Sequence, residues 1–217
     1  MQFAISILSS PELITPTIMP SPPIRDFSQP PGDDEFYSYQ IKIPKDRIAV
    51  LIGKNGEVKE QIQGLLGTEI QVDSSEGEVT ISGKDALQLL TAREVVKAIG
   101  RGFNPSLALY LSKQDVMLDI INVGAIARSP NDLARLKGRL IGAGGKCRRV
   151  IEDLTQTHIS VYGKTVSIIG EMETMLTARR AIEMLLAGSS HPSVYKWLER
   201  QRKHSRNSAF GAQARDV

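Results

Sequence analysis

An internal repeat constrains the fold of this 217-residue chain more than any other feature of its sequence. A Gly-x-x-Gly turn at residues 53–56 recurs 89 positions later, at residues 142–145. The residues downstream recur at the same spacing: Ile62, Leu65, Thr68, Ile70 and Val72 in the first copy match Ile151, Leu154, Thr157, Ile159 and Val161 in the second. This self-similarity predicts two copies of one small domain.

The same order of elements is predicted in both copies. Alternation of apolar and polar residues predicts strands, and apolar periodicity of three to four residues predicts helices. The first copy is predicted to hold strands at 36–43, 69–73 and 78–82 and helices at 45–51, 57–66 and 85–99. The second is predicted to hold strands at 116–123, 157–162 and 165–169 and helices at 130–140, 145–154 and 171–187. Each copy therefore reads β-α-α-β-β-α, with the turn between its first two helices.

These elements predict an α+β fold in which each copy has a three-stranded sheet with helices on one face. The two domains are expected at residues 36–103 and 113–190, joined by a linker at 104–112. Residues 1–35 hold seven of the eleven prolines, which predicts a disordered arm. Residues 191–205 predict an extra C-terminal helix, and residues 206–217 a polar tail.

The Gly-x-x-Gly turn has a chemistry suited to phosphate. Without side chains at its glycines the main chain can approach a phosphate closely, and the following helix presents unpaired N–H groups and a positive dipole end. A single such turn could be only a helix C-cap followed by an N-cap. Two copies at equivalent positions favour binding of single-stranded RNA.

The two halves of the chain differ in charge. Residues 1–110 contain 10 Lys and Arg against 14 Asp and Glu, whereas residues 111–217 contain 17 against 10. Six basic residues and no acid lie between positions 135 and 149. Since basic patches raise affinity for polyanions, the second copy is predicted to supply most of the RNA binding.

The predicted RNA-binding residues are the turns and the cations near them. In the second copy they are Gly142, Ala143, Gly144, Gly145, Lys146, Arg135, Arg139, Arg148 and Arg149, and in the first Gly53, Lys54, Asn55 and Gly56. At Arg148 and Arg149 the alternative is an ion pair on the helix surface, because Glu152 and Asp153 each follow four residues later.

The sequence gives no support for catalysis, a metal or a cofactor. Leu140 stands where a nucleotide-binding Walker A loop needs glycine, and Cys147 replaces its Ser or Thr. The three histidines lack metal-ligand spacing. Cys147 is the only cysteine, which favours a reducing compartment and a small apolar filler over a reactive thiol. No apolar run is long enough to cross a bilayer, so we expect no membrane partner. In keeping with the single cysteine we expect a cytoplasmic protein, and we expect a monomer.

The repeated β-α-α-β-β-α order with its Gly-x-x-Gly turn resembles the type I K-homology (KH) domain, which clamps about four nucleotides. More specifically, residues 135–152, 159–166 and 194–200 are similar to the archaeal branch of the partner-of-Nob (Dim/Krr-like) pre-ribosomal KH proteins. Lys59 and Arg148 stand where most KH helices have isoleucine, a feature that this family shares. Eukaryotic relatives have lost the first turn, whereas this chain keeps Gly53 and Gly56.

This resemblance implies binding near the 3′ end of small-subunit ribosomal RNA during ribosome assembly, and contact with ribosome-assembly or translation factors. The alternative is a protein-interaction scaffold that links such factors, with RNA binding secondary. A scaffold would keep its partners after loss of both turns.

Overall fold

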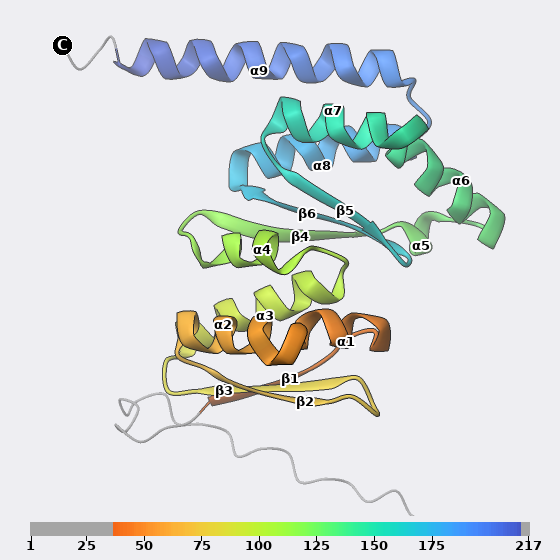
Figure 1. Cartoon of the computed structure of the whole chain (residues 1–217). Coiled ribbons are helices and arrows are strands. Elements are labelled where there is room, and N and C mark those ends of the chain that lie inside the picture. The colour runs from red at the N-terminus through yellow and green to blue at the C-terminus, as the bar shows by residue number, and fades with distance from the viewer. Residues whose placement is uncertain (1–36, 214–217) are drawn as a thin grey trace, which may run out of the picture. The chain divides into compact units, whose positions relative to one another are not determined.

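The computed structural model describes residues 37–213, and the side chains of residues 37–204 (Figure 1). The arm predicted at residues 1–35 lies outside the described residues. The described residues, 37–213, belong to one compact unit.

The first copy has the predicted order of elements. They are β1 (Tyr37–Lys42), α1 (Lys45–Ile52), the 3₁₀ turn η1 (Lys54–Gly56), α2 (Glu57–Leu66), β2 (Glu69–Asp73), β3 (Glu78–Gly83) and α3 (Ala86–Gly100). The strands form an antiparallel sheet in the order β1-β3-β2. Helix α3 begins where the Asp85 carboxylate accepts hydrogen bonds from the N–H groups of Leu87 and Gln88.

The second copy repeats this order. Its elements are β4 (Val116–Asn122), α5 (Val123–Ile126), α6 (Pro130–Ile141), η3 (Ala143–Gly145), α7 (Lys146–Thr155), β5 (His158–Tyr162), β6 (Thr165–Glu171) and α8 (Met172–Leu186). The sheet order β4-β6-β5 matches that of the first copy. The predicted start of α6 is confirmed, since the Ser129 hydroxyl accepts the N–H of Asp132 and Pro130 occupies the first turn. The predicted α+β fold is therefore confirmed.

The second sheet is covered on both faces. Every residue from Thr165 to Gly170 in β6 is buried. Alternate residues of this strand belong to different cores: Ile168 packs with the core of the second copy, and Ile169 packs with that of the first. The prediction placed helices on one face only. Alternation along a strand shows which residues share a face of the sheet, but it does not show what covers the second face.

The segment predicted as a linker is helical and contributes to a core. It forms α4 (Pro105–Ala108) and the 3₁₀ turn η2 (Leu109–Ser112), which bury Ala108 and Leu111 against the first copy. A local signal was present, because Asn104 caps the N–H of Ser106 and Pro105 occupies the first helical turn.

The final helix, α9 (His191–Gln213), is longer than predicted and extends into the segment expected to be a tail. Its residues Val194 and Leu198 are buried in the core of the second copy. No helix in the described part of the chain is both long and apolar enough to span a membrane.

Candidate nucleic-acid interface

The second Gly-x-x-Gly turn joins α6 to α7, and its glycines have two different roles. Gly142, Gly144 and Gly145 have φ angles of 71°, 57° and 78°, which favour glycine. A Cβ on Gly142 would lie 2.7 Å from the Cβ of Cys147, whereas one on Gly144 would meet nothing within 4 Å. The first glycine thus permits close packing of the turn on α7, and Gly144 faces open space.

The first turn has the same backbone geometry. Gly53 and Gly56 have φ angles of 75° and 89°, and a Cβ on Gly53 would lie 2.5 Å from the Cγ2 of Val58. Asn55 occupies the position of Gly144 with a φ of 55°, so a side chain is tolerated there. The two copies therefore present the same main-chain shape to a ligand.

Both turns lead into helices whose first N–H groups lack a side-chain cap. Neither Gly56 nor Gly145 supplies a capping side chain, so the first turns of α2 and α7 keep N–H groups available to an anion. The helix dipole adds partial positive charge at the same place. These features suit a phosphate, and the side chains around each turn decide whether the site attracts or repels it.

Side chains of opposite charge flank the two turns. Arg149 lies 3.6 Å from the place of a Cβ on Gly145, and the equivalent Glu60 lies 3.7 Å from that of Gly56. The Arg149 guanidinium also donates a 2.5 Å hydrogen bond to the carbonyl oxygen of Gly144. The guanidinium is thereby held beside the turn, where the first copy has a carboxylate.

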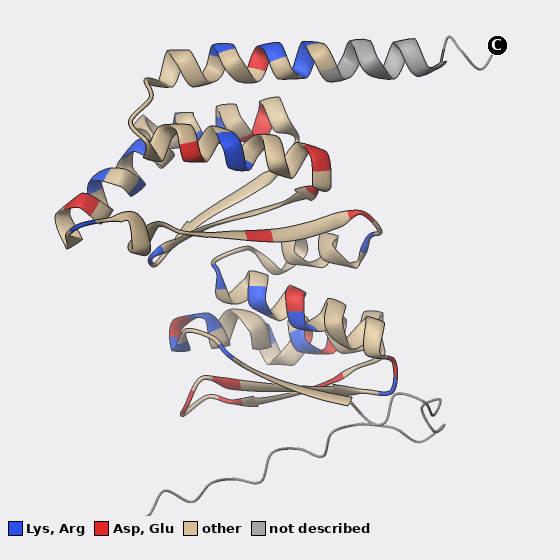
Figure 2. Ribbon diagram, turned by 180° about the vertical axis from the view of Figure 1, so that it is seen from behind, with Lys and Arg blue, Asp and Glu red and all other residues tan. Residues whose placement is uncertain are grey.

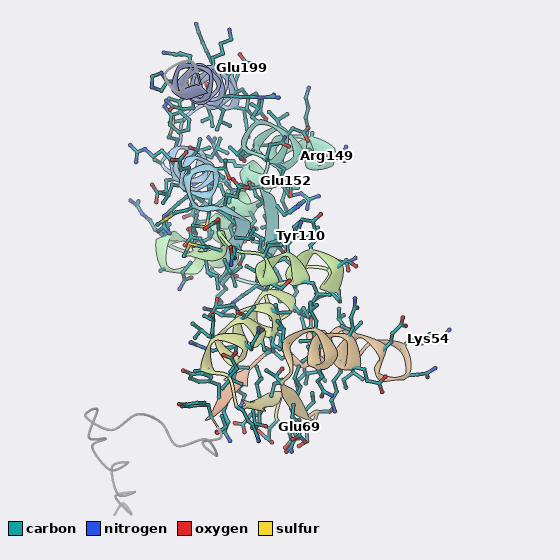
Figure 3. All side chains as sticks on the ribbon, turned by 90° about the vertical axis from the view of Figure 1, so that its left-hand side faces the viewer. Lys54, Glu69, Tyr110, Arg149, Glu152 and Glu199 are labelled. Atoms are coloured by element: carbon teal, nitrogen blue, oxygen red, sulfur yellow. The ribbon has the colours of Figure 1, made fainter. Side chains whose placement is uncertain are left out.

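Among the predicted RNA-binding residues, Lys146 and Lys54 are the cations most available to a ligand. Both are exposed, and neither ammonium group has a hydrogen bond or ion pair with another described residue. Figure 3 shows the Lys54 side chain extending away from the protein. Ala143, in the second turn, is also exposed. The RNA-binding roles of these residues stay predictions, and their exposure is consistent with them.

Arg135 and Arg139, on α6, are occupied within the protein. The Arg135 guanidinium bonds to Asp132 at 2.7 Å and 3.1 Å. Arg139 is half-buried and donates a 2.7 Å hydrogen bond to the carbonyl oxygen of Ser189, so it ties α6 to the segment before α9. Figure 2 shows Lys and Arg gathered along α6, but two of these cations already have protein partners.

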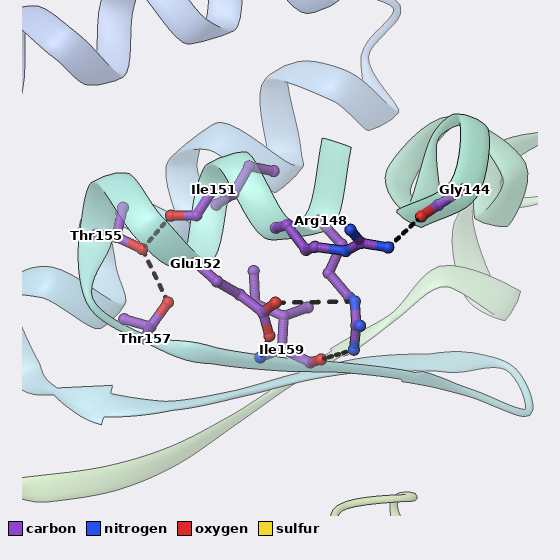
Figure 4. A network of polar contacts seen from close by, with 8 residues as sticks. Gly144, Arg148, Ile151, Glu152, Thr155, Thr157 and Ile159 are labelled. Atoms are coloured by element: carbon purple, nitrogen blue, oxygen red, sulfur yellow. Dashed lines mark hydrogen bonds and ion pairs between the residues drawn. The ribbon is translucent and has the colours of Figure 1, made fainter. Parts of the chain in front are cut away.

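Arg148 and Glu152 bridge α7 to the edge of β5 (Figure 4). The Glu152 carboxylate accepts the N–H of Ile159 at 2.7 Å, and Arg148 donates to the carbonyl oxygen of Ile159 at 3.2 Å. Arg148 Nε lies 3.8 Å from Glu152 Oε2. The predicted alternative of an ion pair with Glu152 is therefore present at Arg148, together with a contact across to the strand that sequence spacing did not reveal.

Comparison with known proteins identifies the two copies. A model of the eukaryotic-type KH domain, type I, for the second domain of Pno1 matches residues 117–203, and a general KH-domain model matches residues 38–98. A KH domain-containing protein of Methanocaldococcus jannaschii is 49% identical over 174 residues, covering 78% of this chain and 76% of the relative. The chain belongs to the archaeal Pno1/Dim2 family.

Other members of the Pno1/Dim2 family match over a similar extent. The RNA-binding protein pno1 of Dictyostelium discoideum is 30% identical, covering 72% of this chain and 68% of its own length. The crystal structure of Dim2p from Pyrococcus horikoshii matches with a TM-score of 0.71 and 46% identity, over 76% of this chain and 99% of that one. Dim2p in the a/eIF2α–aDim2p–rRNA complex of that organism matches with a TM-score of 0.74 and 45% identity, over 78% and 96%.

Cys147 in this Pno1/Dim2 protein is a packing residue. It is 1% exposed, and burial raises the pKa of its thiol. Burial and a hydrogen bond with Cys147 also raise the pKa of Tyr195, on α9, to about 12. The prediction of an apolar filler is consistent with this burial. Across residues 37–204, no three or more His, Cys, Asp or Glu side chains are grouped to hold a metal ion.

Proposed function

We propose that this Pno1/Dim2 family member binds small-subunit ribosomal RNA near its 3′ end during ribosome assembly, mainly through its second KH domain. The related Dim2p of P. horikoshii occurs in a complex with rRNA, and the D. discoideum relative is an RNA-binding protein. The proposed role is binding without catalysis, in the cytoplasm and as a monomer.

The charge reversal around the two turns is the observation that carries the emphasis on the second domain. Lys146 and Arg149 stand in the first turn of α7 where α2 has Glu57 and Glu60. The turns share one main-chain geometry, so the local charge is what distinguishes them. Carboxylates beside the first turn oppose a phosphate there, whereas two cations beside the second attract it.

Exchanging these charges tests the proposal. In the full-length protein, Lys146→Glu with Arg149→Glu should weaken binding of short single-stranded RNA by about tenfold or more, which is about 1.4 kcal/mol. Glu57→Lys with Glu60→Arg should strengthen binding, because the first turn then has the charges of the second. Affinity is measured by fluorescence anisotropy over a series of salt concentrations. The first pair of changes should also reduce the slope of log affinity against log salt, by about 0.7 for each phosphate that the protein no longer neutralises.

A matched control distinguishes the effect of charge beside the turn from the effect of the protein's total charge on RNA affinity. Glu69→Lys with Glu78→Lys adds the same charge on exposed positions of the first sheet, away from both turns, and should change affinity by less than about twofold. If this control strengthens binding as much as the Glu57 and Glu60 changes do, total charge rather than the turn determines affinity. If disrupting the first turn weakens RNA binding as much as disrupting the second turn does, the emphasis on the second domain is refuted.

We propose a translation factor of the a/eIF2α type as a protein partner, because the related Dim2p occurs in a complex with a/eIF2α as well as rRNA. If the chain is mainly a scaffold, the variant with Glu at positions 146 and 149 should bind purified a/eIF2α with unchanged affinity and still function in assembly. If RNA binding is the main role, that variant should lose assembly function even though a/eIF2α binding is intact. Calorimetry with the purified factor and ribosome profiles from cells distinguish the two.

A further inference from the structure

The main chain of Ile159 lies on an open edge of the second sheet, yet both of its polar groups already have partners. Strand β5 pairs only with β6, so every second residue of β5 directs its N–H and C=O away from the sheet. At Ile159 the N–H is bound by the Glu152 carboxylate and the C=O by the Arg148 guanidinium. The Ile159 N–H is therefore unavailable to a base beside the turn unless Glu152 moves, and the carbonyl oxygen could accept from a base only by sharing with Arg148.

The same contacts hold the Arg148 guanidinium in place. It donates a hydrogen bond to the Ile159 carbonyl oxygen and forms an ion pair with the Glu152 carboxylate, and its side chain remains 41% exposed. A guanidinium has five N–H donors in a rigid plane, so these contacts leave other N–H groups available. Arg148 is also the third residue after Gly145, one helical turn from the proposed phosphate site.

We propose that Arg148 reads a guanine base in the RNA held by the second turn, and that Glu152 is a positioning residue for it. This inference rests on the proposed RNA binding by the second domain. The free donors of a fixed, planar fork fit two acceptors on one edge, and guanine presents O6 and N7 in that arrangement. Adenine has an amino donor beside N7, so it offers only one acceptor to the two N–H donors of the guanidinium.

The first copy supplies natural control side chains for both positions. Lys59 stands in place of Arg148, and Gln63 stands in place of Glu152. Gln63 Oε1 accepts the N–H of Ile70 at 3.0 Å, so the amide makes the same strand contact that Glu152 makes to Ile159. Arg148→Lys and Glu152→Gln therefore introduce side chains that this fold already accommodates, and both variants should remain folded.

Binding of the full-length protein to short uridine oligomers tests the inference. One oligomer carries a central guanosine, and its counterparts carry adenosine or 7-deazaguanosine, which lacks N7. The wild type should prefer guanosine to adenosine by about tenfold, because a bidentate Arg–guanine pair contributes about 1–3 kcal/mol of discrimination. It should also bind 7-deazaguanosine several-fold less tightly than guanosine.

The variants should lose this preference without losing general affinity. Arg148→Lys should bind all three oligomers within about twofold of one another. Glu152→Gln should give an intermediate preference, because Arg148 then loses its ion pair with the carboxylate and is held less firmly. The salt slope should be unchanged in both. If the contact of Arg148 and Glu152 with the strand is merely structural, its loss in the variants should lower stability and weaken binding of all oligomers equally.

Two results would overturn the inference while leaving the proposed function intact. One is wild-type binding with no preference for guanosine. The other is an Arg148→Lys variant that binds every oligomer more weakly and has a salt slope reduced by about 0.7, since that pattern identifies a phosphate contact. If the wild type binds none of the oligomers, the proposed function fails, and this inference fails with it.

Discussion

At the scale of single residues, the first glycine of the turn is expected to serve folding and the third residue to serve binding. A methyl group on Gly142 would lie 2.7 Å from the Cβ of Cys147 and 2.8 Å from its backbone nitrogen, at a φ of 71°. Gly142→Ala should therefore destabilise the protein by about 3 kcal/mol, from the clash and the left-handed backbone together. Urea unfolding followed by circular dichroism measures this change.

The neighbouring Gly144 provides the control. Gly144→Asn copies Asn55 of the first turn, and a Cβ at position 144 meets no atom within 4 Å, so the change should cost less than about 1 kcal/mol. Gly144→Asp has nearly the same shape but adds a negative charge, and it should weaken RNA binding more than Gly144→Asn does. Similar decreases in stability at Gly142 and Gly144 would show that the two glycines do not have separate roles.

The sequence predicted which residues have the chemistry to bind RNA better than it predicted which of them are available. The turn and Lys146 follow from local spacing, because a glycine turn followed by a helix start is a local structure. The partners of Arg139 and Arg148 are Ser189 and Ile159, which lie 50 and 11 residues away. Such contacts depend on tertiary packing, which one sequence does not show.

At the scale of elements, most of the predicted strands and helices agree with the structure to within one or two residues. Helix α2 and strand β2 have the predicted bounds, because Gly67 ends the helix and strict alternation marks the strand. The short helices α4 and α5 were missed. Each has four residues, which is too short for an apolar period of 3.6 to be visible.

Helix α9 should behave as part of the second domain rather than as an appendage. Leu198 is 1% exposed, and Val194 is fully buried in the same core. Leu198→Ala should destabilise the protein by about 3 kcal/mol, because it removes buried apolar surface and leaves a cavity. Glu199→Ala, at the exposed neighbouring position, is the control and should change stability by less than about 0.5 kcal/mol. Thermal unfolding that is unchanged in Leu198→Ala would mean that α9 is detached in solution.

At the scale of the whole molecule, the difference in net charge between the two halves of the chain does not arise evenly along each half. Residues 37–103 contain nine Lys and Arg and nine Asp and Glu, so the acidic excess of residues 1–110 comes from residues 1–36. The first domain is thus neutral overall. What distinguishes its turn is the position of Glu57 and Glu60, and electrostatic attraction at a binding site depends on such nearby charges more than on distant ones.

The two KH domains share buried surface, which the repeat by itself did not predict. Ile169 packs into the core of the first domain, and Ser160 Oγ donates a 2.9 Å hydrogen bond to the carbonyl oxygen of Arg101. The Tyr162 hydroxyl donates to the Asp46 carboxylate. A repeat in the sequence shows that two domains are alike, and only the structure shows that the second sheet has one face on each core.

This shared packing predicts that the domains unfold together. Ile62 is fully buried in the first core, so Ile62→Ala should destabilise that domain by about 3 kcal/mol. The only tryptophan, Trp197, packs against the second core and reports its unfolding by fluorescence. In urea, Ile62→Ala should lower the midpoint of the Trp197 transition, because loss of the first core exposes the face of the second sheet that contains Ile169. Leu65→Ala, at a 56% exposed position of the same helix, is the matched control and should leave the midpoint nearly unchanged. A Trp197 midpoint that does not respond to Ile62→Ala would mean that the two domains unfold independently.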